Sequence, residues 1–294
     1  MTSEPSTQDL IDLLFALQQQ LPAVEGLGLD GRGRIAVRAQ RGQPIPLPDR
    51  ALGVPVVPQH APEPPSIAGW TLPEPIRIGG AHRPAGTLGA VVWRGSQPLV
   101  LSNAHVIVPP QALVQPSNSQ SCWGAEAAVG TPVAPGRAFV ARGRVDRFMP
   151  LVSGPRGVNV ADAAVASWHT HLPQHECQGA TEGVHGLLVA KRGIGDPRLR
   201  GGPVVLRRAV WIVKTGDYGL RGQGSEFVFA EQLVVNLRQS GGDSGAVLRD
   251  ERGAAVGLLH ARIGATLALA TPASHIEALL DVRFVERGRC APPL

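Results

Sequence analysis

Glycine and proline interrupt this chain unusually often, with 36 Gly and 27 Pro among 294 residues. Both residue types favour turns and break regular helices. Between them lie short apolar segments rich in β-branched residues, including 87–93, 99–102, 203–215, 226–235 and 254–259. Many short strands separated by turn signals are typical of a barrel or a sandwich. The sequence therefore predicts an all-β fold and argues against a helical bundle or a coiled coil.

The charge pattern argues against nucleic-acid binding. Lys and Arg total 28 against 23 Asp and Glu, a formal net charge of +5, and Lys191 and Lys214 are the only lysines. The arginines are scattered, without the dense basic run that tracks a phosphate backbone. Aromatic residues make up only 4% of the chain, too few for a base-stacking platform. No apolar stretch approaches the roughly 20 residues that span a bilayer, so we expect no membrane partner either.

The first 66 residues differ in pattern from the rest. Residues 8–20 place leucines at helical spacing, with Thr7 as the expected cap. Residues 24–39 predict two strands around a glycine-rich turn, and the proline-crowded stretch 44–65 predicts a connector. We therefore expect a small α+β extension over residues 1–66 and a main domain over 67–294.

One further helix is predicted near the C-terminus. Ser274 and Glu277 have the spacing of a capping box, ahead of an apolar helical segment at 278–282.

Three short segments carry side chains suited to chemistry. They are Leu101-Ser-Asn-Ala-His105, Asn159-Val-Ala-Asp162 and Gly241-Gly242-Asp243-Ser244-Gly245. Each alone has a structural interpretation: a histidine at a strand end, an acid in a cap or bulge, and an ordinary glycine turn. A lone carboxylate in an apolar strand is costly unless a partner binds it. The three segments together, on a strand-rich chain, point to a nucleophilic site.

These segments resemble the three signature blocks of trypsin/chymotrypsin-like serine peptidases. Together with Gly86-Thr-Leu-Gly89, their residues are most similar to those of the intracellular bacterial branch, which is related to the plant narrow-leaf-type peptidases. The resemblance covers roughly residues 67–285, and residues 26–37 also resemble the N-terminal region of those relatives. The chain departs from secreted members in having no cysteine beside His105 or Ser244, and from many members in having Ala246 where they have a second glycine.

The resemblance implies a fold and a division of roles. The fold would be a chymotrypsin-like double β-barrel, with barrel one at about 67–170 and barrel two at about 183–285. His105 would act as the base, Asp162 would orient it, and Ser244 would attack a peptide carbonyl. The backbone N–H groups of Gly242 and Ser244 would form the oxyanion hole. No cofactor or metal is implied.

The same resemblance suggests a substrate preference and a possible activation step. Arg238 occupies the place of the floor of the first specificity pocket, and His260 and Arg262 occupy its wall, which would favour an acidic side chain before the scissile bond. Alternatively, Arg238 faces solvent and the strand is shifted by one residue. Arg77-Ile78 resembles an activation cleavage site, whose freed amine would pair with Asp243, yet the segment also fits a plain strand.

Two weaker patterns bear on metals and on location. His169, His171, His175 and Cys177 crowd one segment at spacings that could gather zinc, although we expect no metal because the segment falls in the connection between the barrels. Cys122, Cys177 and Cys290 form an odd set without paired spacing, and the first ten residues lack the pattern of a signal peptide. These features predict a cytoplasmic protein without disulfides.

The sequence thus predicts a cytoplasmic serine endopeptidase that acts on protein or peptide substrates. Activity inside a cell would have to be restrained, by narrow specificity, an occluded cleft or a partner that binds residues 1–66. The alternative is an inactive, peptidase-derived interaction module.

Overall fold

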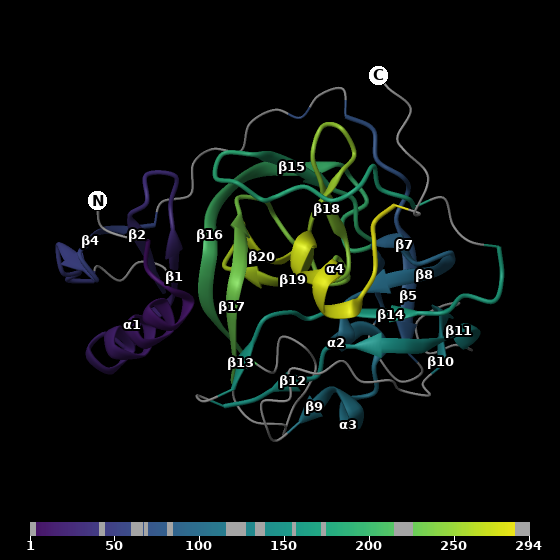
Figure 1. The fold of residues 1–294 in the computed structure, drawn as a ribbon, viewed down its shortest axis with the longest axis horizontal. Helices are drawn as coiled ribbons and strands as arrows, with labels where there is room; N and C mark the ends of the chain where they lie inside the picture. The colour runs from purple at the N-terminus through teal and green to yellow at the C-terminus, as the bar shows by residue number, and fades with distance from the viewer. Residues whose placement is uncertain are drawn as a thin grey trace.

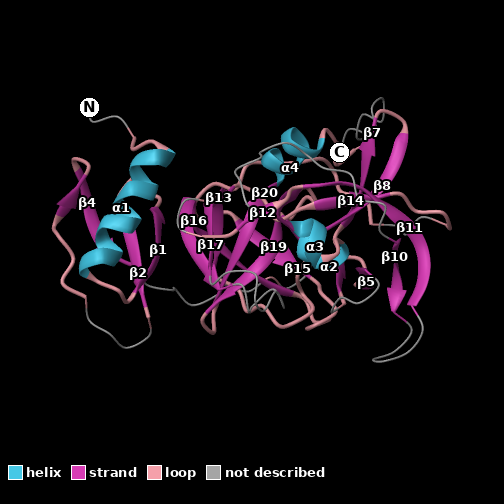
Figure 2. Ribbon diagram, turned by 90° about the horizontal axis from the view of Figure 1, so that it is seen from below, coloured by secondary structure: helices cyan, strands magenta, loops and turns pink. Residues whose placement is uncertain are grey.

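The computed structural model describes residues 4–40, 45–59, 67, 70–80, 85–115, 128–132, 139–154, 157–171, 175–214 and 226–285. Within these ranges strands dominate, and they form two large curved sheets side by side (Figure 1, Figure 2). The predicted all-β class, with two barrel-like sheets, is confirmed.

The first sheet has the strand order β6-β5-β10-β11-β14-β8-β7, and every neighbouring pair is antiparallel. Its strands are β5 (Ile76–Gly80), β6 (Gly86–Leu88), β7 (Ala90–Arg94), β8 (Gln97–Ser102), β10 (Ala128–Pro132), β11 (Phe139–Phe148) and β14 (Ala164–Ala166). Beside it lie the short helices α2 (Ala104–Ile107) and α3 (Pro110–Leu113) and the small parallel pair β9 (Val114–Gln115) and β12 (Leu151–Val152).

The second sheet contains a closed ring. Strand order β17-β20-β19-β18-β15-β16 is completed by an additional β16–β17 pairing, so the six strands close on themselves. They are β15 (Leu188–Lys191), β16 (Arg200–Lys214), β17 (Glu226–Val235), β18 (Val247–Arg249), β19 (Ala255–Ile263) and β20 (Leu267–Pro272), and β13 (Val158–Asn159) joins β17 in parallel. Closure removes the unpaired edges that an open sheet exposes.

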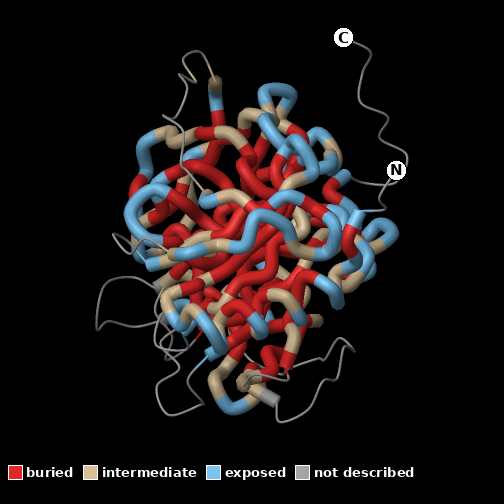
Figure 3. The backbone as a smooth tube through the Cα atoms, turned by 90° about the vertical axis from the view of Figure 1, so that its left-hand side faces the viewer, coloured by how far each residue is buried: buried red, intermediate tan, exposed pale blue. Residues whose placement is uncertain are grey.

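Alternate residues of one strand serve two cores. In β8, Val100 packs into the cluster that also contains residues of β16 and β17, whereas Leu99 and Leu101 pack toward the C-terminal helix α4 (Ala273–Leu280). This is the two-residue period of a strand that is buried on both faces. The buried residues run continuously through the centre of the molecule (Figure 3).

The N-terminal extension continues the second sheet. It comprises α1 (Thr7–Gln20), β1 (Val24–Leu29), β2 (Ile35–Ala39), β3 (Arg50–Ala51) and β4 (Val54–Pro58). Strands β1 and β2 form the predicted antiparallel hairpin, and β1 pairs with β16 of the ring. The proline-rich stretch differs from the expected connector, because β4 within it pairs in parallel with β2. The boundary near residue 66 stays a prediction, since residues 60–66 lie outside the described ranges.

Both predicted helices exist, but their caps differ from the expectation. Ser6, not Thr7, caps α1. The Ser6 hydroxyl accepts a hydrogen bond from the Asp9 backbone N–H, and the Asp9 carboxylate accepts one from the Ser6 backbone N–H. Helix α4 starts at Ala273 after Pro272, without a side-chain cap, so the capping box predicted at Ser274 is wrong. Ser274 lies within the first turn of that helix.

Candidate active site

His105 and Asp162 are brought together by two neighbouring strands of the first sheet. His105 lies in α2, directly after β8, and Asp162 lies two residues before β14. Since β8 and β14 are hydrogen-bonded, with Ser102 opposite Ala164, the two segments emerge side by side. The sheet register thus accounts for a meeting of residues that are far apart in sequence.

The contact uses both the side chain and the backbone of the histidine. Nδ1 of His105 is in short contact with Oδ2 of Asp162, and the His105 backbone N–H donates to Oδ1 over 3.1 Å. Asp162 is fully buried, whereas His105 is 8% exposed. Because an ionised carboxylate only accepts hydrogen bonds, Nδ1 carries the proton and Nε2 is the basic nitrogen. This is the tautomer that a general base requires.

The charge state of Asp162 follows from its neighbours. Burial raises the pKa of this carboxyl, because the charged form loses its hydration. The charge of His105 and its hydrogen bonds act in the opposite direction, and the net pKa lies below the usual value. Asp162 therefore stays ionised at neutral pH.

Ser244 lies in a tight turn between β17 and β18. Gly242 and Gly245 adopt φ angles of +96° and +92°, which favour glycine. A Cβ on Gly245 would lie 2.2 Å from the Thr87 carbonyl oxygen, so the approach of the first sheet also requires a glycine. The backbone N–H groups of Gly242 and Ser244, the predicted oxyanion donors, bond to no other residue in the described part of the chain.

The Ser244 hydroxyl also makes no hydrogen bond to any described residue. The structure therefore joins His105 to Asp162 but does not join Ser244 to His105 by a hydrogen bond. Such bonds are often long in the unliganded state and tighten when substrate binds.

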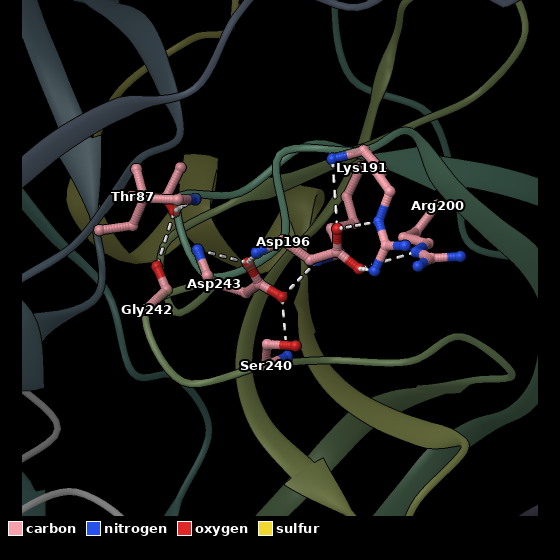
Figure 4. Close-up of polar contacts among 10 residues, drawn as sticks. Thr87, Lys191, Asp196, Arg200, Ser240, Gly242 and Asp243 are labelled. Atoms are coloured by element: carbon pink, nitrogen blue, oxygen red, sulfur yellow. Dashed lines mark hydrogen bonds and ion pairs between the residues drawn. The ribbon is translucent and has the colours of Figure 1, made fainter.

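Thr87 connects the serine turn to the first sheet, a role that sequence reasoning did not assign. Its hydroxyl donates to the Gly242 carbonyl over 2.8 Å and accepts from the Ile194 backbone N–H over 3.0 Å. Its backbone N–H donates to the Ser244 carbonyl over 2.8 Å. Thr87 is only 2% exposed and lies directly beside the turn (Figure 4). No sequence pattern around this threonine could have predicted those contacts.

Asp243, between the two oxyanion residues, forms a buried ion pair with Lys191. Both side chains are completely buried. One carboxylate oxygen also accepts from the backbone N–H groups of Gly195 and Asp196, and the other from that of Ser240 (Figure 4). Burial lowers the pKa of Lys191, and the Asp243 carboxylate opposes that shift by stabilising the ammonium.

In the intact chain this ion pair already occupies Asp243, so activation by cleavage at Arg77-Ile78 stays a prediction. The Asp243 carboxylate that a freed amine would need is already bound to Lys191 and three backbone N–H groups. Ile78 itself is fully buried in β5, opposite Gly86 of β6. The alternative interpretation of this segment, a plain strand, is the one observed. Lys191 is one of only two lysines in the chain, but no sequence pattern indicates that its partner is Asp243.

Ser244 lines a cavity of about 620 Å³. The cavity wall combines residues of β16, β19 and the 239–244 turn with residues of the N-terminal extension. Its members are Gln18, Pro22, Val24, Glu25, Gln40, Trp211, Ile212, Val213, Lys214, Glu226, Gln239, Ser240, Gly241, Ser244, His260, Ala261, Arg262, Ile263 and Gly264.

Of the three residues predicted to bind substrate, two line this cavity and one does not. His260 and Arg262 are part of the wall, whereas Arg238 is exposed and outside it, with Gln239 facing the cavity instead. Arg238 thus faces solvent, as the alternative interpretation had it; it lies in the irregular segment after β17, and the strand shift in that alternative stays a prediction. Arg238 therefore does not support the predicted preference for an acidic side chain. For His260 and Arg262 a role in substrate binding stays a prediction.

His260 is a buried neutral imidazole. Its Nε2 donates to Oε1 of Gln232 over 2.9 Å, and its ring lies 4.6 Å from that of Phe229. Gln232 is held in this orientation because its amide nitrogen donates to the carbonyls of Val160 and Ala230. Burial lowers the pKa of His260 to about 4, despite the opposing charge of Asp162. His260 therefore brings no positive charge to the cavity at neutral pH.

The histidines of residues 169–175, which have the spacing of a possible zinc site, do not gather around one point. His175 is buried and its Nε2 donates to the Glu74 carbonyl, while His169 and His171 are exposed. In the described ranges no three metal-binding side chains gather. Cys177 is a buried free thiol whose pKa burial raises to about 11, and Cys122 and Cys290 lie outside the described residues. No helix in the described part of the chain has the length and hydropathy to cross a membrane.

Comparisons with known proteins give structural likenesses only. No protein-family model matches the sequence, and no curated protein matches it significantly. Among solved structures, protease A of Thermobifida fusca is 13% identical at a TM-score of 0.48, covering 71% of this chain and 96% of that one. Cellulomonas bogoriensis chymotrypsin is 11% identical at 0.48, covering 72% and 97%. A glutamic acid specific serine protease is 14% identical at 0.48, covering 71% and 97%. These values are too low to carry a conclusion about activity or substrate.

Proposed function

We propose that this protein is a serine endopeptidase that cleaves peptide bonds through His105, Asp162 and Ser244. The observation that carries the proposal is the buried, ionised Asp162 in contact with Nδ1 of His105. A solvent-excluded carboxylate that fixes the imidazole tautomer costs free energy, and general-base catalysis gives that arrangement a use. Ser244 supplies the nucleophile, on a Gly-Asp-Ser-Gly turn that lines the adjacent cavity.

The residues act in a fixed order. As the Ser244 hydroxyl attacks the peptide carbonyl, Nε2 of His105 takes its proton and later gives it to the leaving amine. Asp162 stabilises the imidazolium without becoming protonated. The N–H groups of Gly242 and Ser244 donate to the oxyanion. Water then attacks the acyl carbon while Nε2 of His105 takes its proton, and the histidine gives that proton to Oγ of Ser244 as the ester bond breaks.

Two finer expectations belong to this proposal. Asp243 is paired with Lys191 in the intact chain, which supports an enzyme that needs no cleavage to order its oxyanion turn. Restraint would then come from narrow specificity, from an occluded cleft, or from a partner that binds residues 1–66. A cytoplasmic, bacterial enzyme of the intracellular branch fits the free buried Cys177.

A peptide library tests the proposal. The full-length protein is incubated with a complex mixture of proteome-derived peptides, and new termini are identified by mass spectrometry. Wild type is expected to generate a defined set of cuts that Ser244→Ala and His105→Gln abolish. Ser274→Ala, the same change at an exposed position of α4, is the matched control and should cut like wild type. Identical new termini in wild type and Ser244→Ala would overturn the proposal and favour the interaction module.

A further inference from the structure

The N-terminal extension provides one wall of the cavity that contains Ser244. Gln18, Val24, Glu25 and Gln40 line the cavity from α1, β1 and the end of β2, whereas Ser244 lines it from the ring. The extension therefore does more than cover the outside of the barrel. The cavity has walls from both parts of the chain.

The extension is built rigidly into the ring. Gly26 of β1 lies opposite Trp211 of β16, and a Cβ on Gly26 would lie 2.3 Å from the indole ring. Trp211, itself part of the cavity wall, thus packs flat on the extension. Beneath it, a continuous apolar cluster joins residues of α1, β1 and β2 to Val210, Val228 and Ala230 of the ring. Burial on this scale fixes the wall in place.

A polar clamp fixes the start of α1. Arg208 and Glu231 adopt left-handed φ angles of +49° and +57°, which are costly for residues with a side chain. The two side chains bond to each other and to Thr7, and Arg208 also pairs with Glu4. Strained backbone in β16 and β17 thus presents the groups that hold the extension.

The unsatisfied groups of the cavity are acceptors. Gln239 is only 4% exposed, and its Oε1 has no hydrogen-bond partner in the described ranges. Glu25 is half-buried and has no ion-pair partner within 4 Å there; burial raises its pKa, although Arg38 and Lys214 partly oppose this. By contrast, the side chains of the cations Lys214 and Arg262 are exposed to solvent. A ligand gains most by bringing hydrogen-bond donors to the buried acceptors.

We propose that Glu25 of the extension and Gln239 of the ring form a subsite for a basic side chain of the peptide substrate. The inference rests on the proposed function, because the subsite opens beside Ser244. It differs from the acidic preference predicted from the sequence, since Arg238 is absent from the cavity wall and His260 is neutral. A carboxylate supplied by the extension makes residues 1–40 part of the specificity machinery.

Cleavage specificity is the first test. Full-length wild type, Glu25→Gln and Asp12→Asn are given positional peptide mixtures that carry arginine, norleucine or glutamate at each position. Wild type should prefer arginine at one position, and Glu25→Gln should lower the arginine-to-norleucine ratio of kcat/KM there by at least about tenfold, the loss of one charge-assisted hydrogen bond. Asp12→Asn removes an exposed carboxylate of the same extension, outside the cavity, and should keep the wild-type ratio.

Binding separates this inference from the proposed function. In the full-length Ser244→Ala variant, fluorescent peptides with arginine should bind more tightly than matched norleucine peptides, and adding Glu25→Gln should abolish the difference. Equal preference with and without Glu25, or a preference for glutamate, would overturn the inference even if wild type cleaves peptides. Arginine-selective binding that depends on Glu25, without any cleavage by wild type, would uphold the subsite and reject the endopeptidase.

Discussion

Among the residues that the structure describes, Asp162 and Asp243 are the two aspartates with no exposed surface, and each contacts a basic side chain. Asp162 contacts His105, which retains 8% exposure, whereas Asp243 contacts Lys191, which has none. In the proposed function the Asp162 pair exchanges a proton with a bound molecule, whereas the Asp243 pair has no exposed surface and holds the backbone of the turn through its hydrogen bonds. The comparison teaches that the exposure of the partner, not the burial of the acid, separates a chemical role from a structural one.

The largest expected effect is on the chemical pair. Asp162→Asn should lower the rate of peptide hydrolysis by roughly 10⁴-fold, because an amide no longer holds the required tautomer or stabilises the imidazolium. The folded strands should persist by circular dichroism. Asp146→Asn, which removes a part-exposed carboxylate paired with Arg94, is the control and should keep the wild-type rate. Loss of fold in Asp162→Asn would place Asp162 in the structural class with Asp243.

The Lys191–Asp243 pair should affect stability rather than the rate of hydrolysis. Lys191→Met should reduce the free energy of unfolding in urea by about 3–5 kcal/mol, because it leaves the Asp243 charge buried without a cation. Adding Asp243→Asn should restore part of the loss. Arg198→Met removes the exposed partner of Asp196 and should cost less than about 1 kcal/mol. Equal losses for Lys191→Met and Arg198→Met would contradict the account.

The pH dependence of stability sharpens the comparison through His260, the buried imidazole near Asp162. Its pKa falls from 6.5 to about 4 on folding, so between these values the unfolded chain binds the extra proton. Stability should therefore decline as pH falls from 6.5 to 4, by roughly 3 kcal/mol at most from this group. Burial also lowers the pKa of His275, which adds to the decline.

The contribution of His260 is isolated by a variant. His260→Gln should show a shallower decline than wild type over the same pH range in urea titrations, with His275 unchanged in both. Parallel pH profiles for the two proteins would mean that the pKa of His260 does not fall on folding.

The smallest expected effect concerns the contact between the two sheets. Thr87→Val removes the donor to the Gly242 carbonyl and the acceptor for the Ile194 N–H, both buried. The free energy of unfolding should fall by about 1–3 kcal/mol, and peptide hydrolysis should slow because the oxyanion turn loosens. Thr170→Val, at an exposed position, should change neither measurement. Unchanged hydrolysis in a destabilised Thr87→Val would limit this threonine to folding.

Local patterns predicted the fold class and the β1–β2 hairpin, because turn signals restrict the residue types between strands. The Gly-Asp-Ser-Gly block and the histidine after a strand were singled out instead because, with Asp162, they resemble the signature blocks of a known peptidase family. The contact of His105 with Asp162 is observed, whereas the catalytic roles stay a prediction. The cap of α1 was misassigned by one residue, to Thr7 instead of Ser6, because both can cap and only the backbone decides.

Long-range contacts were beyond sequence reasoning. Lys191 and Asp243, or Thr87 and Gly242, are far apart in the chain, and no spacing rule relates them. The cavity wall contributed by Glu25 depends on the pairing of β1 with β16, which neither strand's pattern specifies. Arg238 was expected in the pocket from its spacing before Ser244, but it lies in the irregular segment after β17, where spacing alone does not decide which side chain faces the cavity.

Labelling with a fluorophosphonate tests the central claim most directly, because the reagent needs an activated serine but no particular peptide sequence. The adduct is quantified by intact mass and located by peptide mapping. The account predicts one adduct, on Ser244, that is lost in Ser244→Ala and strongly slowed in Asp162→Asn. A folded wild-type protein that takes up no reagent, or that reacts at another serine, would contradict it.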